Sequence, residues 1–224
     1  MTETPLKLVL FDVDGTLVDS QETIVSCMQG AFDTFEYPVP TPQDILSIVG
    51  LSLPVAVERL APDLDMRSRA LVVDAYKELF RLTRHEKGAG HSPLYAGARK
   101  CLDALHDIPE LLLGVATGKS KRGLDGLLQA HDLKMFVTQQ VADHHPSKPH
   151  PSMVFTAMED VGVAPEHCVM IGDTTYDIEM GRAAGVKTVG VDWGYHPAYK
   201  LGADHLVTDF NELQDLLLNR LWKN

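Results

Sequence analysis

Five short runs of apolar residues are the clearest pattern along the chain. Each run is continuously hydrophobic rather than alternating, which is typical of strands covered on both faces, as in a parallel sheet. Helical patterns separate the later runs. The predicted strands occupy residues 6–11, 111–116, 135–139, 168–172 and 186–191, and the predicted helices 96–107, 120–131, 150–161 and 176–184. This alternation predicts an α/β fold with a doubly wound, mostly parallel sheet.

The stretch between the first two predicted strands is helical instead. Apolar residues share one helical face in two segments, first Ile24, Met28, Ala31 and Phe35, then Met66, Val73, Tyr76 or Lys77, and Phe80. Prolines between residues 38 and 62 divide the region into shorter helices, and residues 87–97 form a glycine-containing linker. We therefore predict a catalytic core domain, residues 1–18 and 92–224, and an inserted all-helical cap domain, residues 19–91.

The charge of the chain restricts its partners. Its 224 residues include 20 Lys and Arg against 31 Asp and Glu, a formal charge of −11. This field argues against nucleic acid and against an anionic membrane, although local cations could still bind a small anionic substrate. Cys27, Cys101 and Cys168 form no C-x-x-C pair, which favours reduced thiols. The first apolar run fits neither a signal peptide nor a membrane span. We expect a cytoplasmic monomer or homodimer.

Carboxylates, a hydroxyl and lysines follow the ends of the predicted strands. In chain order these residues are Asp12, Asp14 and Asp19, then Thr117, Gly118 and Lys119, then Lys148, and finally Asp173 and Asp177. In open α/β sheets the ligand crevice lies at the carboxyl ends of the strands. We therefore expect at least four of the carboxylates, the hydroxyl and a lysine to converge at one edge of the sheet.

Carboxylates gathered at one edge are costly unless a cation neutralises part of their charge. Oxygen ligands together with substrate phosphate are what Mg²⁺ prefers, so we predict a magnesium site. Asp12 follows a rigid strand directly, as a nucleophile requires, and Asp14 could serve as general acid and base. Thr117 and Lys148 could hold phosphoryl oxygens, because an anion that attacks a phosphate needs cationic help.

Four motifs, DVDGTLVDS, ATGKS, KPHP and IGDTTYDIEMGRAAG, resemble in order those of the haloacid dehalogenase superfamily. The match is closest to its phosphoglycolate phosphatase-like branch, which has a Rossmann-like sheet and a helical cap. The resemblance implies that Asp12 is a nucleophile forming an aspartyl-phosphate, and that Asp14 is the acid/base whose backbone carbonyl also binds Mg²⁺. It further implies Asp12 and Asp173 as metal ligands, with Asp177 supporting that site through water or Lys148. The implied phosphate-binding residues are Asp12, Gly15, Thr117, Gly118 and Lys148.

Two details bear on the activity that the resemblance implies. Members that dehalogenate lack the aspartate at the position of Asp14, so a phosphatase is favoured. Gly118 stands where the branch commonly has an asparagine, which removes one possible substrate contact. We predict a Mg²⁺-dependent phosphatase of a small phosphorylated metabolite, with phosphoglycolate as the leading candidate. The alternatives are a phosphohexose mutase, an inorganic pyrophosphatase, or a non-catalytic member that binds a metabolite or protein.

The same residues also allow other interpretations. An EF-hand calcium loop is disfavoured because Gly15 comes too soon, and GVATGKS is one residue short of a P-loop. Asp177 could instead be a carboxylate that stabilises a helix start. Asp19 is interpreted as the N-cap of the first cap helix, with Glu22 three residues on.

Other side chains could surround the site without taking part in chemistry. The histidines at 144, 145 and 150 lack zinc-site spacing and are interpreted as a solvated loop. Trp193 and Tyr195 could line the edge or serve packing. Residues 47–55 should lie over the active site and select the substrate. They contain no Arg or Lys, so a carboxylated substrate would need Arg59, Lys119 or Arg122.

Overall fold

The computed structural model describes residues 5–222, and at its centre lies a six-stranded sheet whose paired strands are all parallel. The strands are β1 (Lys7–Phe11), β2 (Leu111–Thr117), β3 (Phe136–Val141), β4 (Cys168–Gly172), β5 (Lys187–Val191) and β6 (His205–Val207). Their order across the sheet is β3-β2-β1-β4-β5-β6. The direction of winding reverses between β1 and β4, and ligands bind at such switch points in open α/β sheets.

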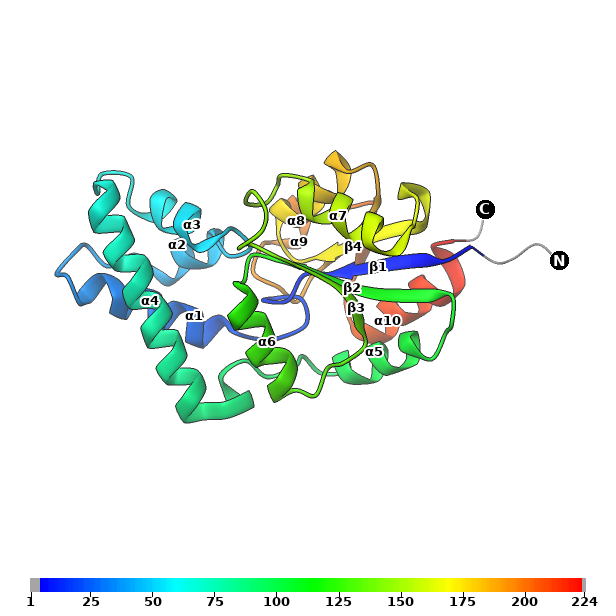
Figure 1. The fold of residues 1–224 in the computed structure, drawn as a ribbon, viewed down its shortest axis with the longest axis horizontal. Helices are drawn as coiled ribbons and strands as arrows, with labels where there is room; N and C mark the ends of the chain where they lie inside the picture. The colour runs from blue at the N-terminus through cyan, green and yellow to red at the C-terminus, as the bar shows by residue number, and fades with distance from the viewer. Residues whose placement is uncertain (1–4, 223–224) are drawn as a thin grey trace.

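Helices cover both faces of this sheet (Figure 1). They are α5 (Ala98–His106), α6 (Lys121–Ala130), α7 (Ser152–Val161), α8 (Thr175–Ala183), α9 (Ala198–Leu201) and α10 (Phe210–Asp215), with the 3₁₀ turn η2 (Pro165–His167) and the π-helical segment η3 (Leu216–Arg220). The predicted doubly wound α/β fold is confirmed. The strand β6 was not predicted, because it is only three residues long and only Val207 in it is buried.

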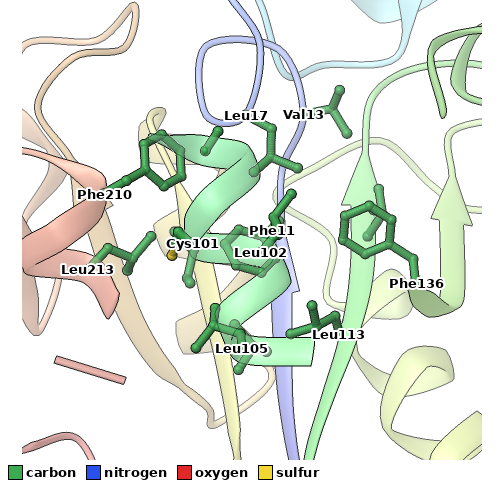
Figure 2. Packing of buried hydrophobic residues seen from close by; sticks show 14 of the residues in the cluster. Phe11, Val13, Leu17, Cys101, Leu102, Leu105, Leu113, Phe136, Phe210 and Leu213 are labelled. Atoms are coloured by element: carbon green, nitrogen blue, oxygen red, sulfur yellow. The ribbon is translucent and has the colours of Figure 1, made fainter. Parts of the chain in front are cut away.

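The two faces of β1 explain why its sequence is continuously hydrophobic. Val9 and Phe11 pack into a cluster with α5, α6 and α10, whereas Leu8 and Leu10 pack into a second cluster with α7 and α8. Figure 2 shows part of the first cluster, in which side chains from α5 lie against Phe11. All four of these β1 residues are fully buried. Burial of each such side chain contributes about 1.5–3 kcal/mol, which fixes β1 rigidly beneath the residues that follow it.

The chain between β1 and β2 forms a separate group of helices, called here the helical insertion. It consists of α1 (Gln21–Asp33), α2 (Pro42–Ser47), α3 (Leu53–Leu60), α4 (Met66–Lys87) and the 3₁₀ turn η1 (Gly88–His91). These helices pack around their own apolar cluster, which includes Met28, Phe32, Ile45 and Val72. In Figure 1 they lie to one side of the sheet. The residue boundaries of a core and a cap domain remain a prediction.

Two local predictions within the insertion are wrong. Met66 is 85% exposed, because it occupies the first position of α4 and the buried part of that helix begins only at Val72. Asp19 is not the N-cap of α1. Ser20 occupies that position, and the Asp19 carboxylate accepts a hydrogen bond from the Gln21 backbone N–H. No helix within residues 5–222 is both long enough and apolar enough to cross a membrane.

Candidate active site

The site begins at Asp12 and the turn that follows it. β1 ends at Phe11, and the backbone N–H of Asp12 still donates to the Ile171 carbonyl of β4, so Asp12 leaves the sheet from a fixed position. Gly15 follows with φ +82°, and a Cβ there would lie only 2.2 Å from Asp173 Oδ2. Glycine is therefore required, both by the backbone conformation and by the close approach of Asp173.

Three carboxylates from two strand ends meet beside this turn. Oxygens of Asp12, Asp173 and Asp177 all lie within 4.8 Å of one another, and all three residues are buried. Among the described residues they form the one group that could hold a metal ion. Lys148 enters from the loop after β3, with Nζ 2.9 Å from Asp12 Oδ1 and 2.6 Å from Asp177 Oδ1. The structure thus brings together four predicted site residues.

Asp177 has two roles in the structure. Its Oδ2 accepts hydrogen bonds from the backbone N–H and hydroxyl of Thr174, which form a capping box at the start of α8. Its Oδ1 accepts from Lys148. The interpretation of Asp177 as a helix-start carboxylate and its placement at the metal-type cluster therefore both hold.

Asp173 is fixed by residues that the sequence did not single out for this contact. Thr16 Oγ1 donates to Asp173 Oδ1 at 2.9 Å, and the backbone N–H of Tyr195 donates to Oδ2 at 2.9 Å. The indole of Trp193 in turn donates to the Thr16 carbonyl. The aromatic segment after β5 thus supports the site by positioning Asp173. The one feature of the sequence that pointed to this segment was its position directly after a predicted strand.

Burial perturbs the ionisation of the cluster. Burial raises the pKa of Asp12 to about 7, the charge of Asp177 adds to this, and Lys148 opposes it. Burial, with the charges of Asp177 and Asp12, also raises the pKa of Asp173 well above its ordinary value. Burial opposes a charge on Lys148, but Asp12 and Asp177 outweigh it and raise its pKa. Three carboxylates therefore share a buried site with one cation.

The residues present fit a divalent metal ion. Both Asp12 carboxylate oxygens are buried without a hydrogen bond, because Lys148 lies at ion-pair distance but outside hydrogen-bond geometry. Asp173 is held in place with each oxygen accepting only one bond. An all-oxygen set of this kind suits Mg²⁺. Asp12 and Asp173 would hold the ion, while Asp177 is already engaged by Lys148 and Thr174.

Asp14 lies outside this cluster of three carboxylates. Its carboxylate accepts from Lys119 Nζ, which lies 2.7 Å from each oxygen, and from the Ser20 hydroxyl at 2.5 Å. This explains why Ser20 does not cap α1 with its side chain. The Tyr195 hydroxyl completes the network at 3.0 Å from Ser20 Oγ. A metal contact through the Asp14 backbone carbonyl remains a prediction.

A cavity of about 380 Å³ opens between the helical insertion and the ends of β1 and β2. Its lining includes Asp12, Asp14 and Thr117. Residues 48–54 also line it, in agreement with the predicted position of that loop. The backbone carbonyls of Gly50 and Leu51 approach Gly118 so closely that a Cβ at 118 would lie 2.6 and 2.7 Å from them.

Cations gather along the cavity. Of the three considered from the sequence, Lys119 and Arg122 line it, whereas Arg59 lies outside it and bonds the Tyr176 hydroxyl at 2.9 Å. Arg81 and Arg84 of α4 also line it and were not anticipated. These two arginines reach the cavity through the position of α4 in the fold, which the sequence pattern does not specify.

The histidine-rich loop does not gather three or more possible metal ligands within residues 5–222. His144 and His150 are exposed, as expected. His145 is not simply solvated: it is half-buried, with one ring nitrogen 2.8 Å from Ser152 Oγ and the other 2.8 Å from Gln140 Oε1. That part of the prediction is wrong, because the loop folds back onto β3 and α7.

Comparison with known proteins agrees with this geometry. A family model described as haloacid dehalogenase-like hydrolase matches residues 9–191, which include the ends of β1, β2, β3 and β4 and the site residues that follow them. The chain belongs to the haloacid dehalogenase-like hydrolases. This confirms the family resemblance and the expectation of a hydrolytic enzyme.

Relatives within the haloacid dehalogenase-like hydrolases match nearly the full length. The chain is 30% identical to Pyrophosphatase PpaX of Bacillus pumilus, over 95% of this chain and 97% of that protein. It is 31% identical to a phosphoglycolate phosphatase of Chromobacterium violaceum, over 96% and 97% respectively. A crystal structure of a predicted phosphatase from Clostridium acetobutylicum has a TM-score of 0.83 at 26% identity, covering 96% of this chain and 99% of that one.

Proposed function

We propose that the protein is a Mg²⁺-dependent phosphatase that hydrolyses a small phosphorylated metabolite through an aspartyl-phosphate at Asp12. One observation carries this proposal. Asp12 is a buried carboxylate without hydrogen bonds at the end of the central strand, beside Asp173 and Lys148 and open to the cavity. A carboxylate placed in this way can reach phosphorus while neighbouring groups offset the charge.

Each role in the proposed reaction falls to a residue of this chain. An Asp12 oxygen attacks phosphorus, and the bond to the leaving-group oxygen breaks. Lys148 and Thr117 hold the phosphoryl oxygens, with the backbone at Gly15 and Gly118 close by. Asp14 gives a proton to the departing oxygen and afterwards takes one from the water that releases phosphate. Asp12 and Asp173 would hold Mg²⁺, which would offset the negative charge shared by the carboxylates and the phosphoryl group.

Phosphoglycolate and inorganic pyrophosphate are the leading substrates. Both are suggested by the names of full-length relatives, and both are small enough for a cavity of about 380 Å³. The presence of Asp14 favours phosphate chemistry over dehalogenation. A phosphohexose mutase uses the same residues and differs by retaining the phosphoenzyme. A non-catalytic role is disfavoured because no residue of the four motifs is missing. A cytoplasmic location and a monomer or homodimer remain predictions.

A phosphate-release screen tests the proposal. Purified protein is incubated with phosphoglycolate, pyrophosphate, hexose phosphates and a wider set of phosphorylated metabolites, first with Mg²⁺ and then with a chelator. We expect Mg²⁺-dependent release from at least one compound, and loss of release with chelator. Release from none would overturn the proposal, and a requirement for a bisphosphate activator would instead indicate the mutase.

A further inference from the structure

The ion pair between Lys119 and Asp14 sets this chain's site apart from a simple cluster of carboxylates. Lys119 Nζ lies 2.7 Å from both oxygens of Asp14, and the two side chains are only 8% and 13% exposed. The ammonium also lies 5.2 Å from the centre of the Phe80 ring on α4. Lys119 therefore links the core of the enzyme, the proposed acid/base and the helical insertion.

Both oxygens of Asp14 are engaged in this arrangement. Its two oxygens accept from Lys119, and Oδ1 accepts also from Ser20. A carboxylate in a nearly buried pair is stabilised by its partner and loses much if that partner is removed without replacement. Asp14 can approach a leaving-group oxygen most readily if something else satisfies Lys119.

Lys119 is also the lining cation best placed to receive a substrate group. In the described part of the chain, four other cations line the cavity: Lys77 lies 3.8 Å from Asp74, Arg81 is held by two hydrogen bonds to Glu78, Arg84 donates to the Arg122 carbonyl, and Arg122 is the fourth. Of these five lining cations, Lys119 is the one that pairs with Asp14. Lys119 lines the same cavity as Asp12 and Asp14, and within residues 5–222 Asp14 is the side chain that accepts its hydrogen bonds. An ammonium has three donors, so it can bind a second anion as it releases the first.

We propose that Lys119 is a specificity residue that binds a second anionic group, a carboxylate or a phosphate, on the leaving group of the substrate. This inference rests on the proposed function. The incoming anion replaces Asp14 as the partner of Lys119, so one ion pair is exchanged for another and the buried ammonium stays paired. The Asp14 carboxyl, no longer paired with Lys119, is then free to approach the leaving-group oxygen. A substrate with an uncharged leaving group leaves Lys119 on Asp14 and is disfavoured.

The test compares two kinds of probe in wild type and variants. Phosphoglycolate carries a carboxylate on its leaving group, and ethyl phosphate carries none. We expect Lys119→Met to lower the ratio of kcat/KM for phosphoglycolate over ethyl phosphate roughly 10- to 100-fold, since a charged hydrogen bond is lost. Lys119→Arg should retain an intermediate ratio. Lys134→Met is the matched control, because Lys134 is an exposed lysine paired with Asp132 far from the cavity, and it should keep the wild-type ratio.

The outcomes separate the inference from the proposed function. An equal loss on both probes in Lys119→Met, with a wild-type melting temperature, would overturn the specificity role while leaving the phosphatase intact. A wild-type enzyme that prefers ethyl phosphate would do the same. If pyrophosphate is hydrolysed and phosphoglycolate is not, the ratio of pyrophosphate to ethyl phosphate is used. A wild type that releases phosphate from no compound in the screen contradicts both proposals.

Discussion

Asp12, the proposed nucleophile, is distinguished by where its charge is placed. It lies at the end of a buried strand, where burial raises its pKa to about 7. The positive charge of Lys148 opposes this rise in pKa, and the negative charge of Asp177 adds to it. A carboxylate left without hydrogen bonds in such a place is costly to stability. Functional sites commonly hold strain of this kind, and its cost is met by the apolar burial of the strand beneath.

The variant Asp12→Asn tests the proposed catalytic role of Asp12 separately from its effect on stability. The variant keeps the shape of the side chain and removes its charge, so we expect phosphate release to fall at least about 1,000-fold. In chelator its melting temperature should be no lower than that of wild type, because a buried charge has been removed. Circular dichroism and a phosphate assay measure both quantities. Asp63→Asn, at an exposed loop position, is the control and should change neither. Wild-type turnover by Asp12→Asn would contradict the nucleophile.

At the scale of elements, the helical insertion closes the cavity by touching the end of β2. One part of this contact is made by backbone: the carbonyls of Gly50 and Leu51 lie against Gly118. The glycine that departs from the common asparagine therefore allows the insertion to approach the core closely. A closed cavity excludes water and strengthens the electrostatic interactions inside it.

Gly118→Ala tests this contact. Its Cβ would lie 2.6 Å from a carbonyl oxygen, so the loop of residues 48–54 must move away. Overpacking of this kind costs about 1–3 kcal/mol, and we expect kcat/KM to fall roughly 10- to 100-fold. Steady-state kinetics measure the effect. Gly90→Ala is the control, since a Cβ there meets nothing within 4 Å. Equal values of kcat/KM in Gly118→Ala and Gly90→Ala would show that the close approach of the insertion to Gly118 is unimportant for activity.

The elements and the strand-end residues could be predicted from the sequence because both follow local rules. Continuous apolar runs indicated buried parallel strands, and the switch-point rule then gathered Asp12, Thr117 and Asp173. The contacts that orient them could not be predicted. Thr16 and Tyr195 reach Asp173 across long stretches of chain, and their partners depend on how packed loops meet.

The ion pair between Asp14 and Lys119 also could not be predicted from the sequence. Asp14 and Asp12 are neighbours in one motif, yet one turns toward Lys119 and the other toward Asp173. Asp12 lies directly at the end of β1 beside Asp173, whereas Asp14, two residues further on, lies beside Lys119 and Ser20. Spacing alone predicts that carboxylates are near a site, and tertiary packing decides which of them share it.

For the whole molecule, metal binding should link stability to pH. A carboxyl group whose pKa is raised in the folded state holds its proton more tightly there than in the unfolded chain. Its stabilising contribution is present at low pH and is lost as pH rises through the folded pKa, about 7 for Asp12. Since Mg²⁺ binds the ionised group, it should restore that stability above pH 7 and compete with protons below it.

We therefore expect a pH-dependent stabilisation by Mg²⁺. At pH 8 and a concentration about 100 times Kd, the gain is about 2.7 kcal/mol, a rise in Tm of roughly 5–10 °C for a chain of this size. At pH 5 the rise should be much smaller. Differential scanning fluorimetry with Mg²⁺ and with chelator measures this rise in Tm. Because the two Tm values are subtracted at each pH, the pH dependence of groups that the metal does not touch cancels. Asp173→Asn should abolish the rise. A rise equal at both pH values would contradict the account.

The most direct test of the central claim is to locate the phosphoryl group during turnover. Wild-type protein is mixed with Mg²⁺ and a substrate from the screen, quenched in acid, digested and mapped by mass spectrometry. The account predicts a phosphoryl group on Asp12, absent from Asp12→Asn and from samples with chelator. A phosphoryl group on another residue, or full turnover by Asp12→Asn with no phosphorylated peptide in wild type, would contradict it.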